Sequence, residues 1–259
     1  MIGLGYLPGQ NRSWAYGVSG DGLVVVGQSG FLYGSSQAFR WTTRDGMVGL
    51  GYLTGGDSYG LAYGVSADGS VVVGRGDSAF GLQAFRWTSG GGMVGLGFQS
   101  GASDSTANAV SLDGAVVVGT SGAQAFRWTS GGGMVGLGFS PDATVSVANA
   151  VSGDGSVIVG DVATASGVEA SIWDGVHGMR SLQGVLTNDY GLNLTGWTLQ
   201  YATGISSNGE TIAGWGVNPS GQTEAWIAQI PEPGSYWLLA LGCLLLCVAP
   251  RVVFMRDRT

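Results

Sequence analysis

Lysine is absent from this 259-residue chain, histidine occurs once and cysteine twice. Both cysteines, Cys243 and Cys247, lie in one apolar run near the C terminus. The rest of the chain therefore has neither a disulfide framework nor a cysteine zinc site, and we predict no metal or other cofactor. With His177 as the single histidine, Ser-His or Cys-His catalysis and histidine metal sites are poorly supported.

Basic residues are also scarce, because residues 1–230 carry 15 acids against 7 arginines, a net charge of −8. Such a surface repels phosphates, which argues against a nucleic-acid partner. Glycine is abundant, with 50 residues, and each one costs a helix interior about 1 kcal/mol. No Gly-X-Y period exists, which excludes collagen, and a hydrophobic content of 44% argues against disorder. The composition indicates a β-rich chain with a core.

Three phrases recur in fixed order along residues 1–230, as is typical of repeat proteins. The first has the form Val-Ser-x-Asp-Gly-x-Val-Val-Val-Gly, the second is Ala-Phe-Arg-Trp and the third is Met-Val-Gly-Leu-Gly. Successive units start 41 to 54 residues apart, which suits four strands and is too long for one rung of a β-helix. The five units begin at Ala15, Ala62, Ala107, Ala148 and Ala202.

The joins between the phrases have the chemistry of turns. Asp-Gly, or Asn-Gly in the fifth unit, predicts a two-residue hairpin turn of the primed type. Unbroken apolar runs such as Val71–Val73 predict strands that are covered on both faces. Each unit is interpreted as a four-stranded antiparallel meander, and stacking the units predicts an all-β, five-bladed β-propeller, with a β-solenoid or an open β-stack as the alternative.

The two ends of the repeat region are complementary. Met1–Leu7 matches the third phrase without a unit before it, and the last unit stops at Ala225–Ile230 without its fourth strand. We therefore expect these two segments to pair and close the ring, which would remove exposed strand edges.

The phrases Gln-Ala-Phe-Arg-Trp, Gly-Met-Val-Gly-Leu-Gly and Val-Ser-x-Asp-Gly-x-Val-Val-Val-Gly resemble those of the HAF-repeat family of bacterial extracellular proteins. The resemblance covers residues 1–230 and implies an exported repeat protein. It implies no reaction, because the family has no established catalytic residues. The fourth and fifth units depart from the pattern, with Ser171-Ile172 and Trp226-Ile227 in place of Phe-Arg.

Residues 231–259 form a separate tail. Pro231-Glu232-Pro233 precedes an apolar stretch that predicts a transmembrane helix at about residues 236–255, and a basic end follows. This order resembles the PEP-CTERM sorting signal, which implies removal of the tail by an exosortase-type processing enzyme in a Gram-negative bacterium. It also implies a link to surface polysaccharide or biofilm. The alternative is an ordinary membrane anchor behind a proline-containing linker.

The location that these resemblances imply is outside the inner membrane. We expect a precursor anchored through the C-terminal helix and then a mature protein at the cell surface or in the extracellular space. No signal peptide precedes the repeats, so we expect the true start to lie upstream of Met1.

Most chemistry-bearing residues of the repeats have a structural explanation. His177 is expected at a hairpin tip, and arginines 40, 86 and 127 are expected to stack on tryptophan or pair with an acid rather than bind acidic sugars. The repeated acids are expected to serve their Asp-Gly turns rather than a calcium or glycosidase site. They are Asp21, Asp68, Asp113 and Asp154.

The longest break in the repeat is the connection of residues 182–201. It predicts a sugar-binding surface at Asn188, Asp189, Tyr190 and Trp197, or else a short helix that plugs the propeller. The favoured function is a non-enzymatic surface or matrix module, with surface polysaccharide as its expected partner. The alternative is a secreted carbohydrate-active enzyme that uses two of the acids least explained by the repeat, held about 5 to 10 Å apart. These acids are Glu169, Asp189 and Glu224.

Overall fold

A computed structural model describes residues 1–31 and 34–230 as five consecutive antiparallel sheets. Sheet 1 contains β1 (Arg12–Val18), β2 (Val24–Gly30), β3 (Ser36–Thr42) and β4 (Gly46–Gly49). Sheet 2 contains β5 (Gly60–Val65), β6 (Val71–Ser78), β7 (Gly81–Thr88) and β8 (Gly92–Gly95). Sheet 3 contains β9 (Ser105–Val110), β10 (Val116–Ser121), β11 (Gln124–Thr129) and β12 (Gly133–Gly136).

The last two sheets depart from this regular pattern. Sheet 4 contains β13 (Ala143–Val151), β14 (Val157–Thr164), β15 (Gly167–Asp174) and β16 (Gly178–Ser181), and the helix α1 (Leu182–Asn188) follows directly. Sheet 5 has three strands among the described residues, β17 (Thr198–Ile205), β18 (Thr211–Val217) and β19 (Thr223–Gln229). The predicted repeat of four-stranded antiparallel units is therefore confirmed for the first four units.

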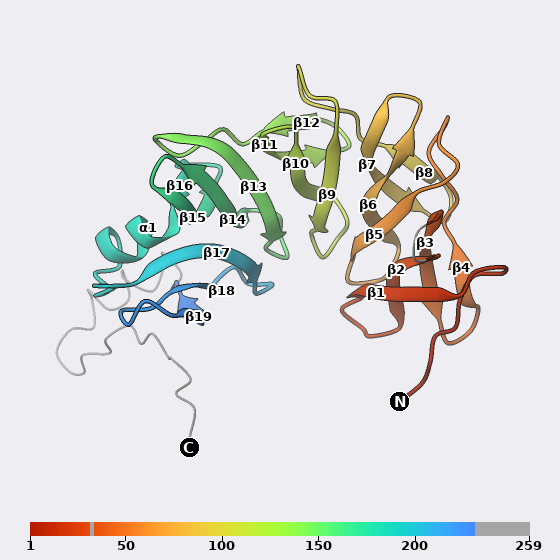
Figure 1. Ribbon diagram of the computed structural model, residues 1–259, viewed down its shortest axis with the longest axis horizontal. Helices are drawn as coiled ribbons and strands as arrows, with labels where there is room; N and C mark the ends of the chain where they lie inside the picture. Colours follow the sequence, from red (N-terminus) through yellow and green to blue (C-terminus); the bar gives the residue numbers. More distant parts are fainter. Residues whose placement is uncertain (32–33, 231–259) are drawn as a thin grey trace.

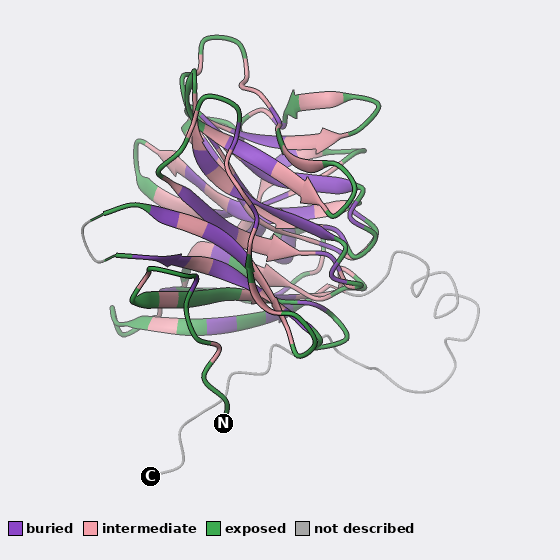
Figure 2. Ribbon diagram, turned by 90° about the vertical axis from the view of Figure 1, so that its right-hand side faces the viewer, coloured by how far each residue is buried: buried purple, intermediate pink, exposed green. Residues whose placement is uncertain are grey.

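The sheets follow one another around an arc (Figure 1). The first strands of successive sheets lie next to one another on the concave side, and the fourth strands lie on the convex side. Buried residues are concentrated in the strands, as Figure 2 shows. Val72 and Val73 point to opposite faces of β6 and are both completely buried, so this valine run is covered on both faces as predicted.

The primed-turn prediction is wrong. At the first hairpin the N–H of Gly22 donates to Ser19 O and the N–H of Ser19 donates to Val24 O, which makes a longer loop. Gly22 has a φ of +73°, whereas Asp21 is not in the positive-φ region. A primed type I turn needs positive φ at both central residues. The chain instead forms a tight turn followed by a left-handed glycine, and the aspartate side chain completes it.

The repeated arginines join neighbouring sheets. Arg40 Nε donates to the carbonyl oxygen of Gly69 at 3.1 Å, and Arg86 donates to the carbonyl oxygen of Gly114. Both acceptors belong to the Asp-Gly turn of the next unit. The structural role predicted for the arginines is thus observed for these two, although the partner is a backbone carbonyl rather than a tryptophan or an acid.

The predicted pairing of Met1–Leu7 with Ala225–Ile230 is not formed. Residues 1–11 contain no strand, and among the described residues β19 pairs with β18 alone. Leu7 is buried against sheet 1, where its N–H donates to Ser29 Oγ at 3.0 Å. This anchor holds the N-terminal segment on sheet 1, on the far side of the arc's opening from β19 (Figure 1).

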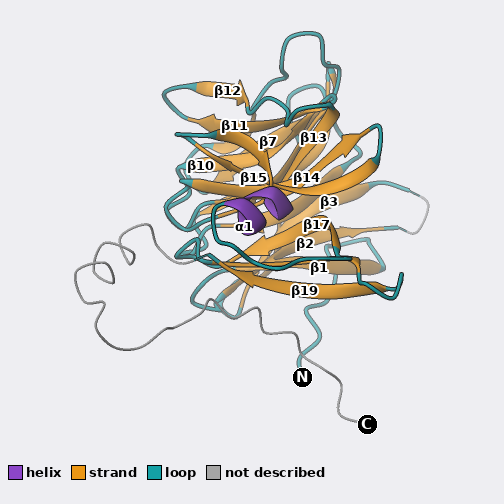
Figure 3. Cartoon of the chain, turned by 90° about the vertical axis from the view of Figure 1, so that its left-hand side faces the viewer, coloured by secondary structure: helices purple, strands orange, loops and turns teal. Residues whose placement is uncertain are grey.

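The connection after sheet 4 does contain a short helix, but α1 does not plug the propeller. It lies on the convex side beside β15 and β16 (Figure 3). Leu182, Val185 and Leu186 bury its apolar face in a cluster shared by sheets 4 and 5. In the part of the chain that the structure describes, no helix has the length and hydropathy to cross a membrane. The predicted transmembrane segment, 236–255, lies outside the described residues.

Candidate functional site

The turn acids are occupied by their own hairpins. In the second unit Asp68 Oδ1 accepts hydrogen bonds from Ser66 Oγ, at 2.7 Å, and from the N–H of Ser70. These bonds, the one from Ser66 first, lower the pKa of Asp68 to about 2. The carboxylates of Asp21, Asp113 and Asp154 each accept from the equivalent serine hydroxyl and backbone N–H of their own unit, and their pKa is also lowered. The predicted turn role is confirmed.

Because the pKa of these turn aspartates is lowered, we expect the free energy of unfolding to fall at acidic pH. A carboxyl whose pKa is depressed in the folded chain contributes stability above its unfolded pKa of about 3.9, and loses it as the pH falls toward the folded value. Changing Asp68, Asp113 and Asp154 together to Asn should therefore flatten the decline in the urea midpoint between pH 4 and pH 2. Near pH 7 the variant should remain close to wild type, because the native Asn208 makes the same turn, accepting from Ser206 Oγ. Parallel declines in both proteins would contradict the assignment.

The irregular junction between sheets 4 and 5 contains a cavity of about 460 Å³, here named the junction cavity. Its wall combines apolar side chains with a charged cluster. The apolar members are Val157, Ile172, Val176, Val185 and Ile230, and the polar ones include Asp174, His177, Arg180, Asp189, Tyr190, Asn208 and Glu210. This volume lies within the range of small-ligand sites, about 300–1,000 Å³.

The charged cluster is a continuous network. Asp174 accepts from Arg180 Nη2 at 2.8 Å through Oδ2, and its Oδ1 lies 2.9 Å from His177 Nδ1. Arg180 Nη1 donates to Asp189 Oδ2 at 3.0 Å. Burial raises the pKa of Asp174, but hydrogen bonds from His177 and Val176 outweigh it, and the net pKa is lowered. Asp174 is therefore held as a carboxylate that orients Arg180 and His177.

The sequence explains why, among the described residues, this network forms in the fourth unit. Asp174 stands where the first three units have threonine, at the end of the third strand, and Arg180 stands where they have an exposed valine of the fourth strand. Asp189 comes from the chain that follows α1. The cluster thus forms where the repeat is broken, and it brings His177 into a site that the hairpin-tip interpretation had not included.

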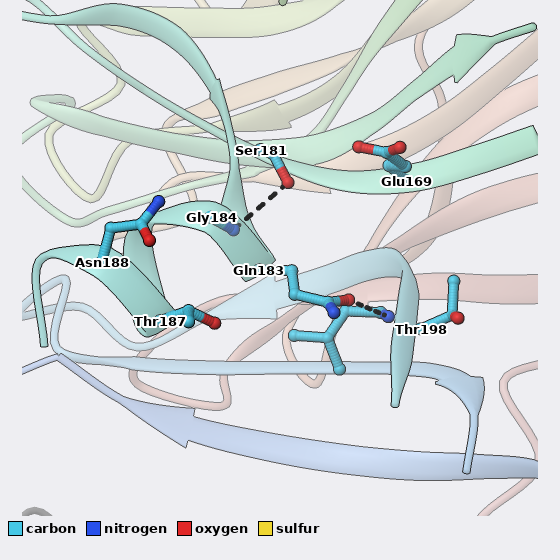
Figure 4. Close-up of a pocket in the computed structure, with 8 residues that line it drawn as sticks. Glu169, Ser181, Gln183, Gly184, Thr187, Asn188 and Thr198 are labelled. Atoms are coloured by element: carbon cyan, nitrogen blue, oxygen red, sulfur yellow. Dashed lines mark hydrogen bonds between the residues drawn. The ribbon is translucent and has the colours of Figure 1, made fainter. Parts of the chain in front are cut away.

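A second cavity of about 480 Å³ lies on the other side of α1 (Figure 4). Glu169, Ser181, Gln183, Asn188 and Thr198 are among the residues that line it. Ser181 caps the helix through a hydrogen bond from the N–H of Gly184, and Gln183 Oε1 accepts from the N–H of Leu199. Gln183 therefore fixes the start of β17 against the helix.

The predicted binding residues are divided by α1. Asp189 and Tyr190 line the junction cavity, whereas Asn188 lines the second cavity. Trp197 packs against the core of sheets 4 and 5, and its carbonyl oxygen accepts from Gln183 Nε2 at 2.9 Å. The helix has only seven residues, and its geometry decides which neighbours share a face. Sequence order alone could not separate them.

The three acids named for the enzyme alternative lie in three different surroundings. Glu169 lines the second cavity and Asp189 is paired with Arg180 in the junction cavity. Glu224 accepts from Asn218 Nδ2. Glu169 and Asp189 therefore do not face each other in one cavity.

The concave side holds a polar and aromatic group that the sequence analysis missed. Tyr16 and Tyr63 are the bulged residues of β1 and β5, and their ring centroids are 5.7 Å apart. Arg75 donates to the hydroxyl of Tyr59 at 3.0 Å. At the equivalent bulge of β9, Asn108 donates to Ala148 O of the next sheet. The sequence does mark these positions, because the residue that follows the constant alanine of the first phrase varies between units, as in Tyr16, Tyr63 and Asn108.

No family model and no curated protein sequence matches the chain. Among solved structures it resembles one described as TolB from Agrobacterium tumefaciens, with a TM-score of 0.55, 15% identity and coverage of 88% of this chain and 78% of that one. Prolyl oligopeptidase B from Galerina marginata gives a TM-score of 0.50, 10% identity and coverage of 85% and 33%. TolB from Acinetobacter baumannii gives a TM-score of 0.46, 17% identity and coverage of 66% and 42%.

At these identities the likeness shows the fold alone. The chain is an all-β repeat protein built from the sheet units of β-propellers such as TolB. It spans 42% of the Acinetobacter protein and a third of the peptidase, so their activities are not carried over.

Proposed function

We propose that this chain is an exported, non-enzymatic binding and structural module of the cell surface or extracellular matrix, with its saccharide site in the junction cavity. The observation that supports it is the mixed wall of that cavity. A sugar ring presents an apolar face and polar edges, and the cavity places valine and isoleucine beside an oriented network of Asp174, Arg180 and Asp189.

The charge of the cavity favours a neutral sugar. Among the acidic and arginine side chains of the wall, Asp174, Asp189 and Glu210 outnumber Arg180 three to one, a net charge of −2. Arg180 is also engaged by two carboxylates, so its positive charge is already compensated within the site. A uronic acid polymer would meet repulsion there.

The binding test is calorimetric titration with a neutral glucan hexasaccharide and with a hexagalacturonate of the same length. We expect binding of the neutral probe and at least tenfold weaker binding of the acidic one. Tyr190→Ala should weaken binding of the neutral probe about tenfold, which corresponds to about 1.4 kcal/mol, because an aromatic contact is lost.

The matched control is Asn188→Ala, because Asn188 lines the second cavity on the other side of α1. It should leave the affinity unchanged. Loss of binding in Asn188→Ala together with normal binding in Tyr190→Ala would transfer the site to the second cavity and contradict the proposal.

The geometry gives the enzyme alternative less support. A glycosidase needs two facing carboxyls in one pocket, whereas Glu169 and Asp189 line different cavities. Export and processing are proposed on the resemblance of residues 231–259 to the PEP-CTERM signal. The motif Pro231-Glu232-Pro233 lies outside the described residues, and the processing enzyme and a surface polysaccharide are its proposed partners.

A further inference from the structure

The four junctions between consecutive sheets repeat one packing pattern. An alanine of the first strand packs on the second-strand valine and the third-strand alanine of the preceding sheet, as Ala107 does on Val73 and Ala84. The first-strand alanines at these junctions are no more than 1% exposed; they are Ala62, Ala107, Ala148 and Ala202. Their equivalent in sheet 1, Ala15, is exposed. We call the face of a sheet that packs on the preceding sheet its leading face, and the opposite face its trailing face. The leading face of sheet 1 is therefore uncovered at Ala15.

Sheet 5 shows the opposite half of the same pattern. The third-strand alanines of sheets 1 to 4 are 0% exposed; they are Ala38, Ala84, Ala125 and Ala170. The equivalent Ala225 of sheet 5 is exposed, and so is Ala213, which corresponds to the buried Val159 of sheet 4. The leading face of sheet 1 and the trailing face of sheet 5 are thus the two complementary halves of one more junction.

The hydrogen-bonding groups of this junction are also in place. At the second junction Ser105 Oγ accepts from the N–H of Ala84 at 2.9 Å and donates to Gly97 O at 2.8 Å. Ser146 does the same between sheets 3 and 4. Ser13 is the equivalent in sheet 1, and its Oγ already donates to Gly5 O at 2.7 Å. The Oγ of Ser13 is also a hydrogen-bond acceptor, and by this pattern its donor is the N–H of Ala225 in sheet 5.

The N-terminal residues fit the edge of β19. In sheet 1 Arg40 of β3 lies opposite Val48 of β4, and the N–H of Leu50 donates to Ala38 O. The same register places Ile2 opposite Ile227. Both isoleucines are exposed, at 77% and 39%. Met1–Gly3 therefore has the sequence and the exposure of the strand that β19 lacks among the described residues.

We propose that these two faces join in trans, so that sheet 1 of a second copy of this chain packs on sheet 5 and its Met1–Gly3 segment adds to β19 as a fourth strand. Within one chain, Leu7 fixes the N-terminal segment to sheet 1 and the repeated junctions set the angle between sheets, so the two faces stay on opposite sides of the opening (Figure 1). A contact between unlike faces leaves each pair of copies with one free face at either end, so further copies add until a ring closes or a filament grows.

The test uses the full chain in mild detergent, because residues 236–249 are apolar, with Cys243 and Cys247 changed to Ser. Ile2→Cys combined with Ile227→Cys should form disulfide-linked dimers and higher oligomers on oxidation, with a yield that rises with protein concentration. Either cysteine alone should not. A monomer that is cross-linked internally at every concentration would show closure in one chain and overturn the proposal, as would the absence of any cross-link.

A second measurement does not depend on cysteine chemistry. Ala225→Arg places a charge on the exposed trailing face, so it should leave the thermal midpoint of the dilute monomer unchanged and raise the dissociation constant in sedimentation at least tenfold. Thr43→Arg, at an exposed hairpin tip, adds the same charge away from both faces and should have no effect on assembly. Equal sedimentation of wild type and Ala225→Arg would overturn the proposal.

Discussion

Replacing Gly119 with alanine is expected to lower the free energy of unfolding by about 3 kcal/mol or more. Gly119 follows the valine run of β10 and pairs with Ala107 beside the bulge of β9. A Cβ at this position would lie 1.9 Å from the carbonyl oxygen of Thr106. Because that atom belongs to the backbone of the partner strand, the ladder itself has to move. Urea denaturation followed by tryptophan fluorescence measures the loss.

Gly131→Ala is the matched control in the same unit. Gly131 is exposed, has no positive φ, and an added Cβ would meet nothing within 4 Å. Its effect should stay within about 0.5 kcal/mol. Equal losses of unfolding free energy in the two variants would show that the close approach of β9 does not require glycine at position 119. The same close approach recurs at Gly27, Gly74, Gly160 and Gly214.

Changing Glu232 to Ala is expected to abolish release of the protein from the inner membrane. If Pro231-Glu232-Pro233 is a processing motif, a chain made with a functional signal peptide should be cut beside it in a host that has exosortase. The apolar stretch alone gives anchoring without removal. Fractionation and immunoblotting of the wild-type and variant chains measure the released share.

The control for sorting is a host without exosortase. There the wild-type chain should remain full length and bound to the inner membrane, as the Glu232→Ala chain does in both hosts. Intact-mass measurement of the released wild-type form gives its C terminus. A released protein that still carries Arg258 and Thr259 would contradict sorting and leave a simple tail anchor.

Local sequence signals predicted the sheet units well and their global arrangement less well. The constant phrases encode strands, turns and the buried valines, so four meanders followed directly from the repeat. The turn type was missed because Ser19 and its equivalents extend the loop and let the aspartate keep a negative φ. Closure of the ring was predicted but is not formed, because it depends on the angle between sheets, which packing at every junction sets together.

The candidate site could be predicted only in part. The break in the repeat pointed to Asp189 and Tyr190, and both line the junction cavity. The sequence did not show that α1 turns Asn188 away from them, nor that Arg180 joins Asp174 to Asp189, since these groups meet only in the folded chain. The bulged Tyr16 and Tyr63 were missed because a bulge changes the face on which a side chain lies.

Hydrogen–deuterium exchange with and without the neutral glucan hexasaccharide tests the saccharide site most directly. The site predicts slower exchange at residues 174–190, where β15, β16 and α1 meet, and at the neighbouring turn of residues 208–210. The Asp-Gly turns of the first three units should exchange at unchanged rates. Unchanged exchange throughout at a saturating concentration, or protection confined to those three turns, would contradict a binding module built at the junction of sheets 4 and 5.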